Sequence, residues 1–257
     1  MNILEARVAL RDRTVIDVVD LALRFVMRSS VAYAKLSLIV LTPSFLVTWW
    51  IAYDAGWGWA WTWTLLIAPF AASPFTALAS RLMFAPSAEI GEVIRASLAA
   101  LPRLLGVRIL QFVGVAFGAL AFLLPAAWFL ALFLFTNEIV VLERATVGGA
   151  LARMQRLLTG GSGDAILAVL FLLALHIMAV FLGDVVGRGI LEDVLEIAPP
   201  PSIFVAKGST LGLAAFWCFV PFAATCRFLL YVNVRTRNEG WDVQTRFAAI
   251  AARTEEA

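Results

Sequence analysis

The chain has 257 residues, of which 62% are hydrophobic and only 15% are charged; its mean hydropathy is +0.90 and its formal net charge is +2. A soluble domain is roughly half apolar and about a quarter charged, so this chain has too few polar side chains to cover its apolar ones in water. The composition excludes a soluble enzyme, a nucleic-acid-binding module and a secreted disulfide-rich scaffold. It predicts an all-α, polytopic membrane helical bundle.

The first 30 residues alternate arginines with acidic residues and contain no clean apolar core, so we expect no cleavable signal peptide. Within them, residues 13–28 carry polar side chains at spacings of three or four, with Val19 and Leu23 on the opposite face. This periodicity predicts an amphipathic helix that lies along the membrane surface, because it is too charged to cross it. Thr14 and Asp17 resemble a capping box at its start.

The apolar runs predict six membrane-spanning helices in three hairpins. A helix needs about 20 apolar residues to cross the bilayer core. The run 104–142 has 39 residues, which suits two spans, and Pro125 near its middle predicts the turn between them. The expected spans lie at 31–53, 61–84, two within 104–142, 164–186 and 208–232.

These spans predict a single integral membrane domain over residues 1–257. Its expected parts are a cytoplasmic amphipathic N-terminal helix in 1–30, a six-span bundle in 31–232 and a cytoplasmic tail in 233–257.

Two further amphipathic segments, 87–101 and 146–158, each precede a pair of spans, as residues 13–28 do. We call these three segments elbow helices. The chain therefore predicts three copies of one unit, consisting of an elbow helix, a span, a short outer turn and a second span.

The basic residues predict the orientation. With six spans both termini lie on one side, and that side holds 18 of the 20 Lys and Arg residues, leaving Arg188 and Lys207 on the other. The positive-inside rule then places both termini in the cytoplasm, in a cell inner (cytoplasmic) membrane.

Aromatic and acidic residues mark the expected outer side. Tryptophans cluster around the first outer turn, where they favour anchoring at the lipid headgroups or, alternatively, an aromatic ligand platform; they are Trp49, Trp50, Trp57, Trp59, Trp61 and Trp63. The third outer connection, 183–206, is acidic and is expected to hold a short helix at 191–197. Asp164 and Asp184, at opposite ends of the fifth span, are expected to contact water.

Four charged side chains are expected near one level in the inner half of the membrane: Arg81, Arg108, Glu138 and Arg227. Charge within the membrane is costly, so such residues are candidates for function. One interpretation is that the arginines extend to the interface and one of them pairs with Glu138 for structural reasons. The other is a cytoplasm-facing vestibule that binds an anionic lipid headgroup or a small anionic solute.

His176 is the only histidine and lies near the middle of the fifth span. We expect it to make one interhelical hydrogen bond, with a proton relay as the alternative. Gly114 with Gly118, and Gly208 with Gly212, form G-x-x-x-G pairs that favour close helix packing or, alternatively, a homodimer face.

No pattern in the sequence indicates catalysis. Cys218 and Cys226 lie about 12 Å apart along one helix, which is beyond disulfide reach. The glycines at 160–163 are followed by Asp164 rather than Lys, which is typical of a turn and helix cap and not of a phosphate-binding loop. We therefore expect no enzymatic activity, no cofactor and no metal site.

Three segments carry a resemblance to a known group. The segment 122–130 contains the expected turn, Leu-Pro125-Ala-Ala. In 140–160, Val-Leu-Glu143 precedes an Ala-Leu-Ala-Arg153 helix ending in Gly, and 231–242 has the sequence Tyr-Val-Asn-Val-Arg-Thr-Arg-Asn-Glu-Gly-Trp-Asp. These segments resemble motifs of bacterial six-helix membrane proteins, comprising the membrane domain associated with glycerophosphoryl diester phosphodiesterases and related uncharacterised families. In this chain Asn233 stands where that group has Asp, Ala126 where it has Gly and Met154 where Ser is common.

The resemblance implies the six-helix fold rather than an activity, since the phosphodiesterase chemistry of that group resides in a separate soluble domain that this sequence lacks. It implies structural roles for Pro125, Glu143, Arg153, Arg235, Arg237, Glu239 and Gly240. From the charges alone, we expect Glu143 to pair with Arg235 or Arg237 and so to fasten the tail to the third elbow helix.

The first functional hypothesis is a non-enzymatic scaffold or accessory subunit of a membrane protein complex. Its partners are the lipid bilayer and another membrane protein or a second copy of the chain, and no nucleic acid. The alternative is a transporter or channel component for a small anion or lipid, which uses the arginines and Glu138 of the inner level. A lipid-modifying enzyme is less favoured because the sequence contains no evident pair of nucleophile and base.

Overall fold

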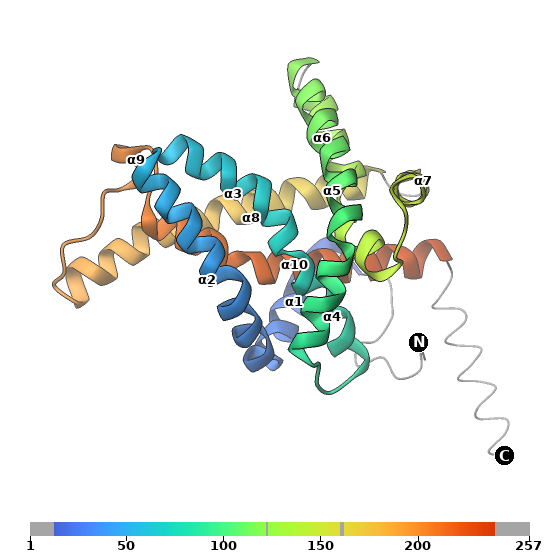
Figure 1. The fold of residues 1–257 in the computed structure, drawn as a ribbon, viewed down its shortest axis with the longest axis horizontal. Coiled ribbons are helices and arrows are strands. Elements are labelled where there is room, and N and C mark those ends of the chain that lie inside the picture. Colours follow the sequence, from blue (N-terminus) through green and yellow to red (C-terminus); the bar gives the residue numbers. More distant parts are fainter. Residues whose placement is uncertain (1–12, 122, 160–161, 240–257) are drawn as a thin grey trace.

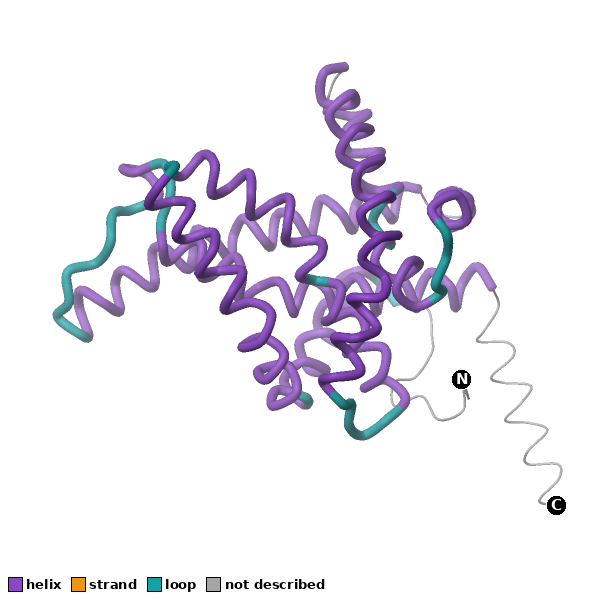
Figure 2. Tube along the Cα trace, viewed as in Figure 1, coloured by secondary structure: helices purple, strands orange, loops and turns teal. Residues whose placement is uncertain are grey.

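The computed structural model describes residues 13–121, 123–159 and 162–239, and the regular structure in these ranges is all helical, as expected (Figures 1 and 2). Gly240 and the rest of the predicted tail, 240–257, lie outside the described residues. Glu239 ends the last helix, but its side chain is also outside the description.

The predicted amphipathic N-terminal helix is confirmed as α1 (Val15–Arg28). Its capping box is present: the Asp17 N–H donates to the Thr14 hydroxyl, and the Thr14 N–H donates to the Asp17 carboxylate, each at 3.3 Å. Val18 and Ala22 are buried against the rest of the protein, whereas the apolar Ile16 is 70% exposed. The helix therefore buries only part of its apolar face within the chain.

The first predicted hairpin is formed by α2 (Ser30–Asp54), α3 (Trp57–Ala71) and α4 (Ser73–Phe84). Gly56 joins α2 to α3 with a φ of +93°, a conformation that favours glycine. The expected second span is two helices placed end to end, with Ala72 as the junction. Pro74 lies in the first turn of α4, where the missing N–H costs no helical hydrogen bond.

Helix α5 (Ile90–Ala121) corrects the prediction of a second elbow helix at 87–101. The amphipathic segment and the third span form one helix of 32 residues, about 48 Å long. Pro102 lies inside it without ending it. The predicted three-fold repetition is therefore incomplete, because the second unit has no separate elbow helix.

Pro125 is not the turn that the sequence predicted. Helix α5 ends at Ala121 and α6 (Leu123–Leu132) begins at Leu123, so both of these helix ends precede Pro125; residue 122 lies outside the described ones. Pro125 instead occupies the first turn of α6, where a missing N–H is tolerated.

The predicted fourth span is interrupted. Helix α6 has only 10 residues and is followed by a turn at 133–135 and the short π-helix η2 (Glu138–Leu142). The segment 131–141 is nevertheless buried at every position. The irregular backbone thus runs through the interior of the protein, where other chain segments surround it. The third elbow helix is confirmed as α7 (Val147–Thr159).

The last predicted hairpin is formed by α8 (Ser162–Gly189) and α10 (Thr210–Glu239). Their connection holds a second π-helix, η3 (Ile190–Val194), and a single turn of helix, α9 (Ile203–Ala206), rather than one short helix at 191–197. Helix α10 continues past Pro221 and past position 233, so the predicted boundary between bundle and tail falls inside a helix.

Among the described residues, five helical stretches are long and apolar enough to cross a membrane: Ser30–Asp54, Trp57–Phe84, Ile90–Ala121, Gly163–Val194 and Thr210–Asn238. The protein is therefore a membrane protein by its helices as well as by its composition. The interrupted segment of α6 and η2, predicted as the fourth of six spans, is not among the five.

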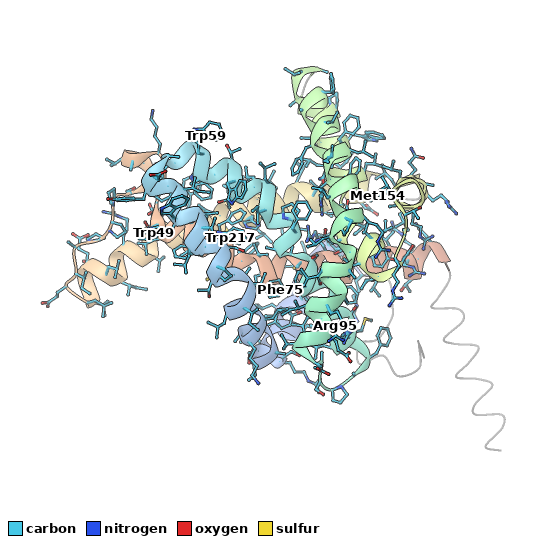
Figure 3. The ribbon with its side chains drawn as sticks, viewed as in Figure 1. Trp49, Trp59, Phe75, Arg95, Met154 and Trp217 are labelled. Atoms are coloured by element: carbon cyan, nitrogen blue, oxygen red, sulfur yellow. The ribbon has the colours of Figure 1, made fainter. Side chains whose placement is uncertain are left out.

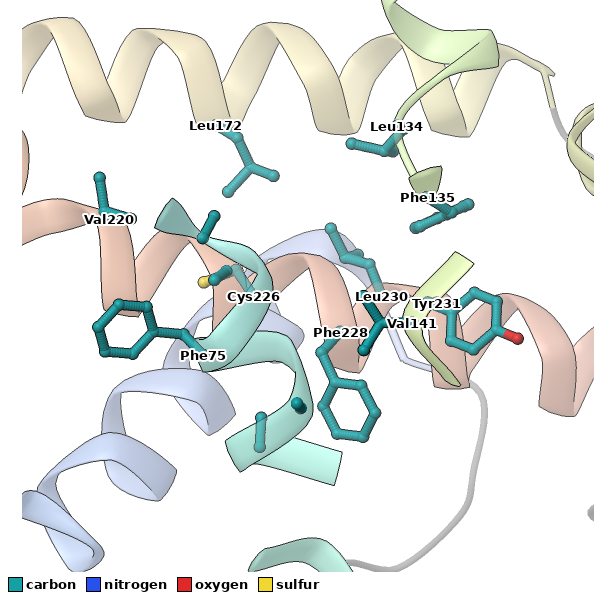
Figure 4. Close-up of a cluster of buried hydrophobic side chains, with 14 of the residues drawn as sticks. Phe75, Leu134, Phe135, Val141, Leu172, Val220, Cys226, Phe228, Leu230 and Tyr231 are labelled. Carbon is teal, nitrogen blue, oxygen red and sulfur yellow. The ribbon is translucent and has the colours of Figure 1, made fainter. Parts of the chain in front are cut away.

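The helices form two arms that meet near the middle of α10. In Figure 1, α8 and α10 run side by side with the hairpin of α2 and α3 beside them, while α5 and α6 project at a steep angle. Figure 4 shows the core at the junction, where Leu172 of α8 points toward α10 and Phe75 of α4 lies beside Cys226. This core is one continuous cluster of buried apolar side chains.

Two buried hydrogen bonds fix α2 to α10. The Trp217 ring N–H donates to the Thr48 hydroxyl at 3.1 Å, and the hydroxyls of Tyr33 and Thr225 lie 2.7 Å apart. Figure 3 shows Trp217 in the interior, whereas Trp49 and Trp59 lie toward the end where α2 meets α3. Trp49 and Trp59 are 44% and 68% exposed, which suits the predicted anchoring at lipid headgroups.

Glycines set the spacing within the projecting arm, and this generates a prediction. A Cβ on Gly118 of α5 would lie 2.7 Å from the Ala126 N atom and 2.9 Å from the Pro125 carbonyl carbon, both in the α6 backbone. We expect Gly118→Ala to lower the free energy of unfolding by about 1–3 kcal/mol, because the backbones must separate. Thermal unfolding in detergent measures the change.

The matched control is Gly58→Ala in α3, where no heavy atom lies within 4 Å of the added Cβ. It should leave the melting temperature unchanged or raise it slightly, since alanine favours helix. Equal destabilisation by both substitutions would contradict the close packing of α5 on α6.

Candidate ligand-binding site

A buried polar cluster lies where α4, α5 and the interrupted segment meet. Arg108 of α5 is only 3% exposed, and its Nη2 atom donates to the Asn137 Oδ1 atom at 2.5 Å. Its Nη1 atom donates to the Gln111 side chain one turn further along α5. Asn137 in turn donates to the Pro69 carbonyl at 2.8 Å. This hydrogen bond ties α3 to the interrupted segment.

Glu138 is fully buried beside this network. The Thr76 hydroxyl of α4 donates to its Oε1 atom at 3.3 Å, while its Oε2 atom has no hydrogen-bond partner among the described residues. The charges of Arg108 and of Arg227 in α10 lie close enough to Glu138 to interact with it. The Arg108 guanidinium and the Glu138 carboxylate are therefore buried together, beside the partly exposed Arg227.

The charges of this site do not balance. With both arginines and Glu138 in their usual ionised forms, the formal charge of the cluster is +1. The Nε atoms of both Arg108 and Arg227 are buried without a hydrogen-bond partner in the described part of the chain. A surplus of positive charge beside a cavity favours an anion as a third component.

A cavity of about 480 Å³ opens onto the two arginines. Besides Arg108 and Arg227, its lining includes the polar side chains of Gln111 and His176, and the rest is almost entirely apolar. The walls come from α3, α5, α8, α10 and the segment after α6, as the following residues show: Trp61, Leu65, Phe133, Leu172, Val180, Phe216. We call this cavity the arginine chamber.

The interruption of the fourth predicted span positions the site. Three consecutive polar residues, 136–138, follow the turn at 133–135, and each of the three is fully buried. A regular helix would distribute these side chains around its circumference. In this structure the backbone changes to a π-helix at Glu138. The Asn137 side chain accepts a hydrogen bond from Arg108, and the Glu138 side chain accepts one from Thr76.

Arg81, the fourth residue of the predicted inner level, lies elsewhere. It pairs with Glu92 of α5, and the two side chains are 34% and 51% exposed. The structure thus brings Arg108, Glu138 and Arg227 together and leaves Arg81 in a surface ion pair near the α4–α5 connection.

A second cluster gathers the motif residues at the expected cytoplasmic end. Glu143 accepts from Arg153 of α7 at 3.2 Å and pairs with Arg235 of α10 at 3.5 Å. The Tyr231 hydroxyl donates to the same carboxylate. The expected pairing of Glu143 with the end of the last helix is therefore present, with Arg235 as the partner. Arg237 pairs instead with Asp164 of α8, at 2.9 Å.

Asn233 fastens the N-terminal helix to α10. Its side-chain amide donates to the Arg13 carbonyl at 3.0 Å and accepts from the Arg13 N–H, also at 3.0 Å. This exchange requires both a donor and an acceptor, which an aspartate in its ionised form does not provide. The position at which the sequence departs from the resembled motif thus has a structural use in this chain.

Several other predictions are settled by single contacts. His176 makes the expected interhelical hydrogen bond, at 3.3 Å from its Nε2 atom to the Phe216 carbonyl of α10. Asp184 does not contact water as predicted: it is 1% exposed and accepts from Ser209, Ser202 and the Ile203 N–H.

Of the two predicted glycine pairs, Gly114 and Gly118 pack within the chain: they face α6, so α6 covers the surface that a homodimer would need. Gly208 and Gly212 do not form a helical pair, because α10 begins at Thr210. Gly208 packs against the Trp57 ring, where a Cβ would lie 2.1 Å from the nearest ring atom. Across the described residues, no group of three His, Cys, Asp or Glu side chains is placed to hold a metal ion.

Sequence reasoning missed Asn137, Thr76, Gln111 and Tyr231. For Asn137 a signal existed, because residues 136–138 are three adjacent polar residues inside an apolar run. No such signal marked Thr76 or Gln111, because single Thr and Gln residues are common in membrane helices that hydrogen-bond to one another. Tyr231 belongs to the terminal motif, but the charges of that motif indicated only its arginines as partners of Glu143.

Comparisons with known proteins identify no relative: no family model, no curated protein and no solved structure matches this chain. The resemblance to the membrane domain of the phosphodiesterase group therefore remains a prediction from the motifs alone.

The Asn233 contact generates a prediction. Asn233→Asp removes the donor to the Arg13 carbonyl and places a carboxylate against that carbonyl oxygen. We expect the free energy of separating α1 from α10 to fall by about 1–3 kcal/mol. Hydrogen exchange of the amides in 15–28 should therefore accelerate. Mass spectrometry of deuterium uptake in detergent micelles measures this exchange.

Asn238→Asp is the matched control, because Asn238 lies on the same helix and is exposed. Unchanged exchange in α1 for both variants would mean that the Asn233 contact does not hold the helix in place.

Proposed function

We propose that this protein is a non-enzymatic, multi-pass protein of the cytoplasmic membrane that binds an anionic ligand in the arginine chamber, as a transporter or lipid-handling component. The carrying observation is that the buried Arg108 and the partly exposed Arg227 line one apolar cavity beside the buried carboxylate of Glu138. This is the second of the two hypotheses from the sequence, now with Arg108, Arg227 and Glu138 as its residues.

The energetic argument rests on the cost of buried charge. An arginine at the centre of a membrane costs about 2.5–3.5 kcal/mol on insertion scales, and two arginines, Arg108 and Arg227, lie in this one cluster. The carboxylate of Glu138 offsets one of these charges. An anion bound in the chamber would offset the other, which gives the site affinity for anions and gives the chamber a use.

The interrupted fourth segment also supports a ligand-handling role. Membrane transporters place binding sites at discontinuous helices, where irregular backbone is buried in protein. Here the segment after α6 breaks within the buried range 131–141 and supplies Asn137 and Glu138 to the site. A scaffold has no need of such a break.

The scaffold hypothesis retains one specific support. The arm of α5 and α6 stands away from the other helices in Figure 1, and on α5 the apolar Val113, Phe117 and Leu120 are 48%, 69% and 85% exposed. Lipid would cover this surface in a bilayer, and so would a helix of a partner protein. The arm is the surface on which a complex subunit would associate.

Six spans with both termini in the cytoplasm form part of the proposal, and labelling tests them. In a Cys218→Ser background, which removes the exposed native thiol, we introduce Glu196→Cys, Ala121→Cys or Gly148→Cys. The first two should react with an impermeant maleimide from outside the cell, and the third only after the membrane is opened. Reaction of Ala121→Cys from the cytoplasmic side alone would mean that the α5–α6 arm does not cross the bilayer.

Anion binding is tested on protein purified in neutral detergent from native membranes. We expect native mass spectrometry to find a bound anionic component on the wild-type chain, and Arg227→Gln to lose most of it because one guanidinium of the chamber is gone. Arg81→Gln is the control, since Arg81 pairs with Glu92 away from the chamber. Equal retention by wild type and Arg227→Gln would refute the arginine chamber as the binding site.

A further inference from the structure

The arginine chamber is lined by charged side chains at one end and by apolar side chains along the rest, which matches the layout of an amphiphile. Arg108 and Arg227 line the inner end, together with Gln111. From there the cavity follows α10 back to Phe216, which is 11 residues before Arg227 and therefore about 16 Å away along the helix. On the facing helix α8 it extends from Val169 to Phe181.

The wall beyond the arginines is suited to an acyl chain. On α8 and α10 the cavity is lined by Val169, Leu172, Ile177, Val180, Phe216 and Val220. The one polar group in this stretch is His176, and its Nε2 atom already contacts the Phe216 carbonyl. A ligand that is charged along its whole length would leave most of its polar atoms unpaired here.

The length of the cavity suits one acyl chain. An extended chain advances about 1.2 Å per bond, so a length of about 16 Å corresponds to about 13 bonds. The cavity is open on the side where Leu173 and Ile177 are 48% and 49% exposed, so a chain can enter it from the surrounding bilayer.

We propose that the ligand of the arginine chamber is a single-chain anionic amphiphile, with its headgroup at Arg108 and Arg227 and its tail directed along α8 and α10 toward Phe181 and Ile203. This inference rests on the proposed function and specifies its ligand class. A carboxylate and a phosphate headgroup share the required chemistry, since each accepts charge-assisted hydrogen bonds from guanidinium donors.

The first experiment compares ligand classes on the wild-type protein in phosphatidylcholine nanodiscs. Four probes are added at equal mole fraction: palmitate, palmitoyl lysophosphatidate, dipalmitoyl phosphatidylglycerol and monopalmitoyl glycerol. We expect at least one of the two single-chain anions to bind at least tenfold more tightly than both the two-chain anion and the single-chain neutral lipid. Which of the two binds distinguishes the carboxylate from the phosphate headgroup.

The second experiment locates the tail. Palmitate carrying a diazirine at its terminal carbon is photolysed in the same nanodiscs, and the adducts are mapped by peptide mass spectrometry. We expect adducts on Val180, Phe181, Ile203 or Phe216, and their loss in Arg227→Gln but not in Arg81→Gln. Adducts confined to lipid-exposed residues such as Leu38 and Phe117 would overturn the proposal.

A cavity-filling pair supplies the matched variants. Ala68→Trp places an indole in the chamber, and Leu66→Trp places one on the exposed surface of the same helix. We expect the first to reduce binding of the single-chain anion more than tenfold and the second to leave it unchanged. The probe comparison on the wild-type chain remains decisive if Ala68→Trp fails to fold.

The outcomes distinguish a failure of the single-chain ligand from a failure of the proposed anion-binding function. If the two-chain anion binds as tightly as the single-chain ones, and Arg227→Gln abolishes both, then the proposed anion-binding function stands and the single-chain inference falls. If no anionic probe binds in a manner that depends on Arg227, both fall.

Discussion

The burial of the Arg108 guanidinium with the Glu138 carboxylate, beside the partly exposed Arg227, is the constraint on which the rest of this structure depends. A folded domain is stable by only about 5–15 kcal/mol, and each unpaired charge in a membrane interior costs a sizeable part of that. The chain meets this cost by breaking its fourth apolar segment, which lets Asn137 and Glu138 reach Arg108 from a backbone that other helices enclose. A regular helix in that place would leave Arg108 with fewer partners, so the charge cluster and the irregular backbone require each other.

Helix α10 links this cluster to the cytoplasmic end. Arg227 lines the chamber, and one turn later Tyr231 donates to Glu143, which also receives Arg153 and Arg235. Two residues further, Asn233 holds α1. Because these contacts lie on one continuous helix, a displacement of α10 at the chamber would alter the contacts of Glu143 and α1 as well. The motif residues in the last helix thus have an evident structural purpose, which is to fix the helix that carries Arg227.

The sequence predicted the features that depend on local periodicity. The amphipathic α1 with its capping box, the helix α7 and the first and fifth spans all follow from the spacing of apolar and polar residues. It failed where tertiary contacts override periodicity: the segment 87–101 has an amphipathic pattern but continues into the next span as α5, and Pro125 begins a helix rather than a turn. Of the four charged residues predicted to lie at a similar depth in the membrane, Arg108, Glu138 and Arg227 lie together in the structure. Depth along a helix was predictable for Arg81, but the face it occupies was not, because Glu92 became its neighbour only through the α4–α5 connection.

The distinction between a scaffold and a ligand-binding protein depends on what the interior is shaped to hold. A protein that acts only by packing has no evident use for an open apolar cavity whose charged end holds two arginines. Nor does it gain from the buried charge of Arg108, because an apolar side chain in place of a buried charge is often neutral or stabilising. The apolar wall and the surplus positive charge occur together in the chamber. A ligand with an apolar tail and an anionic head complements both, which is why the geometry favours this class of ligand over a small inorganic anion or an apolar molecule.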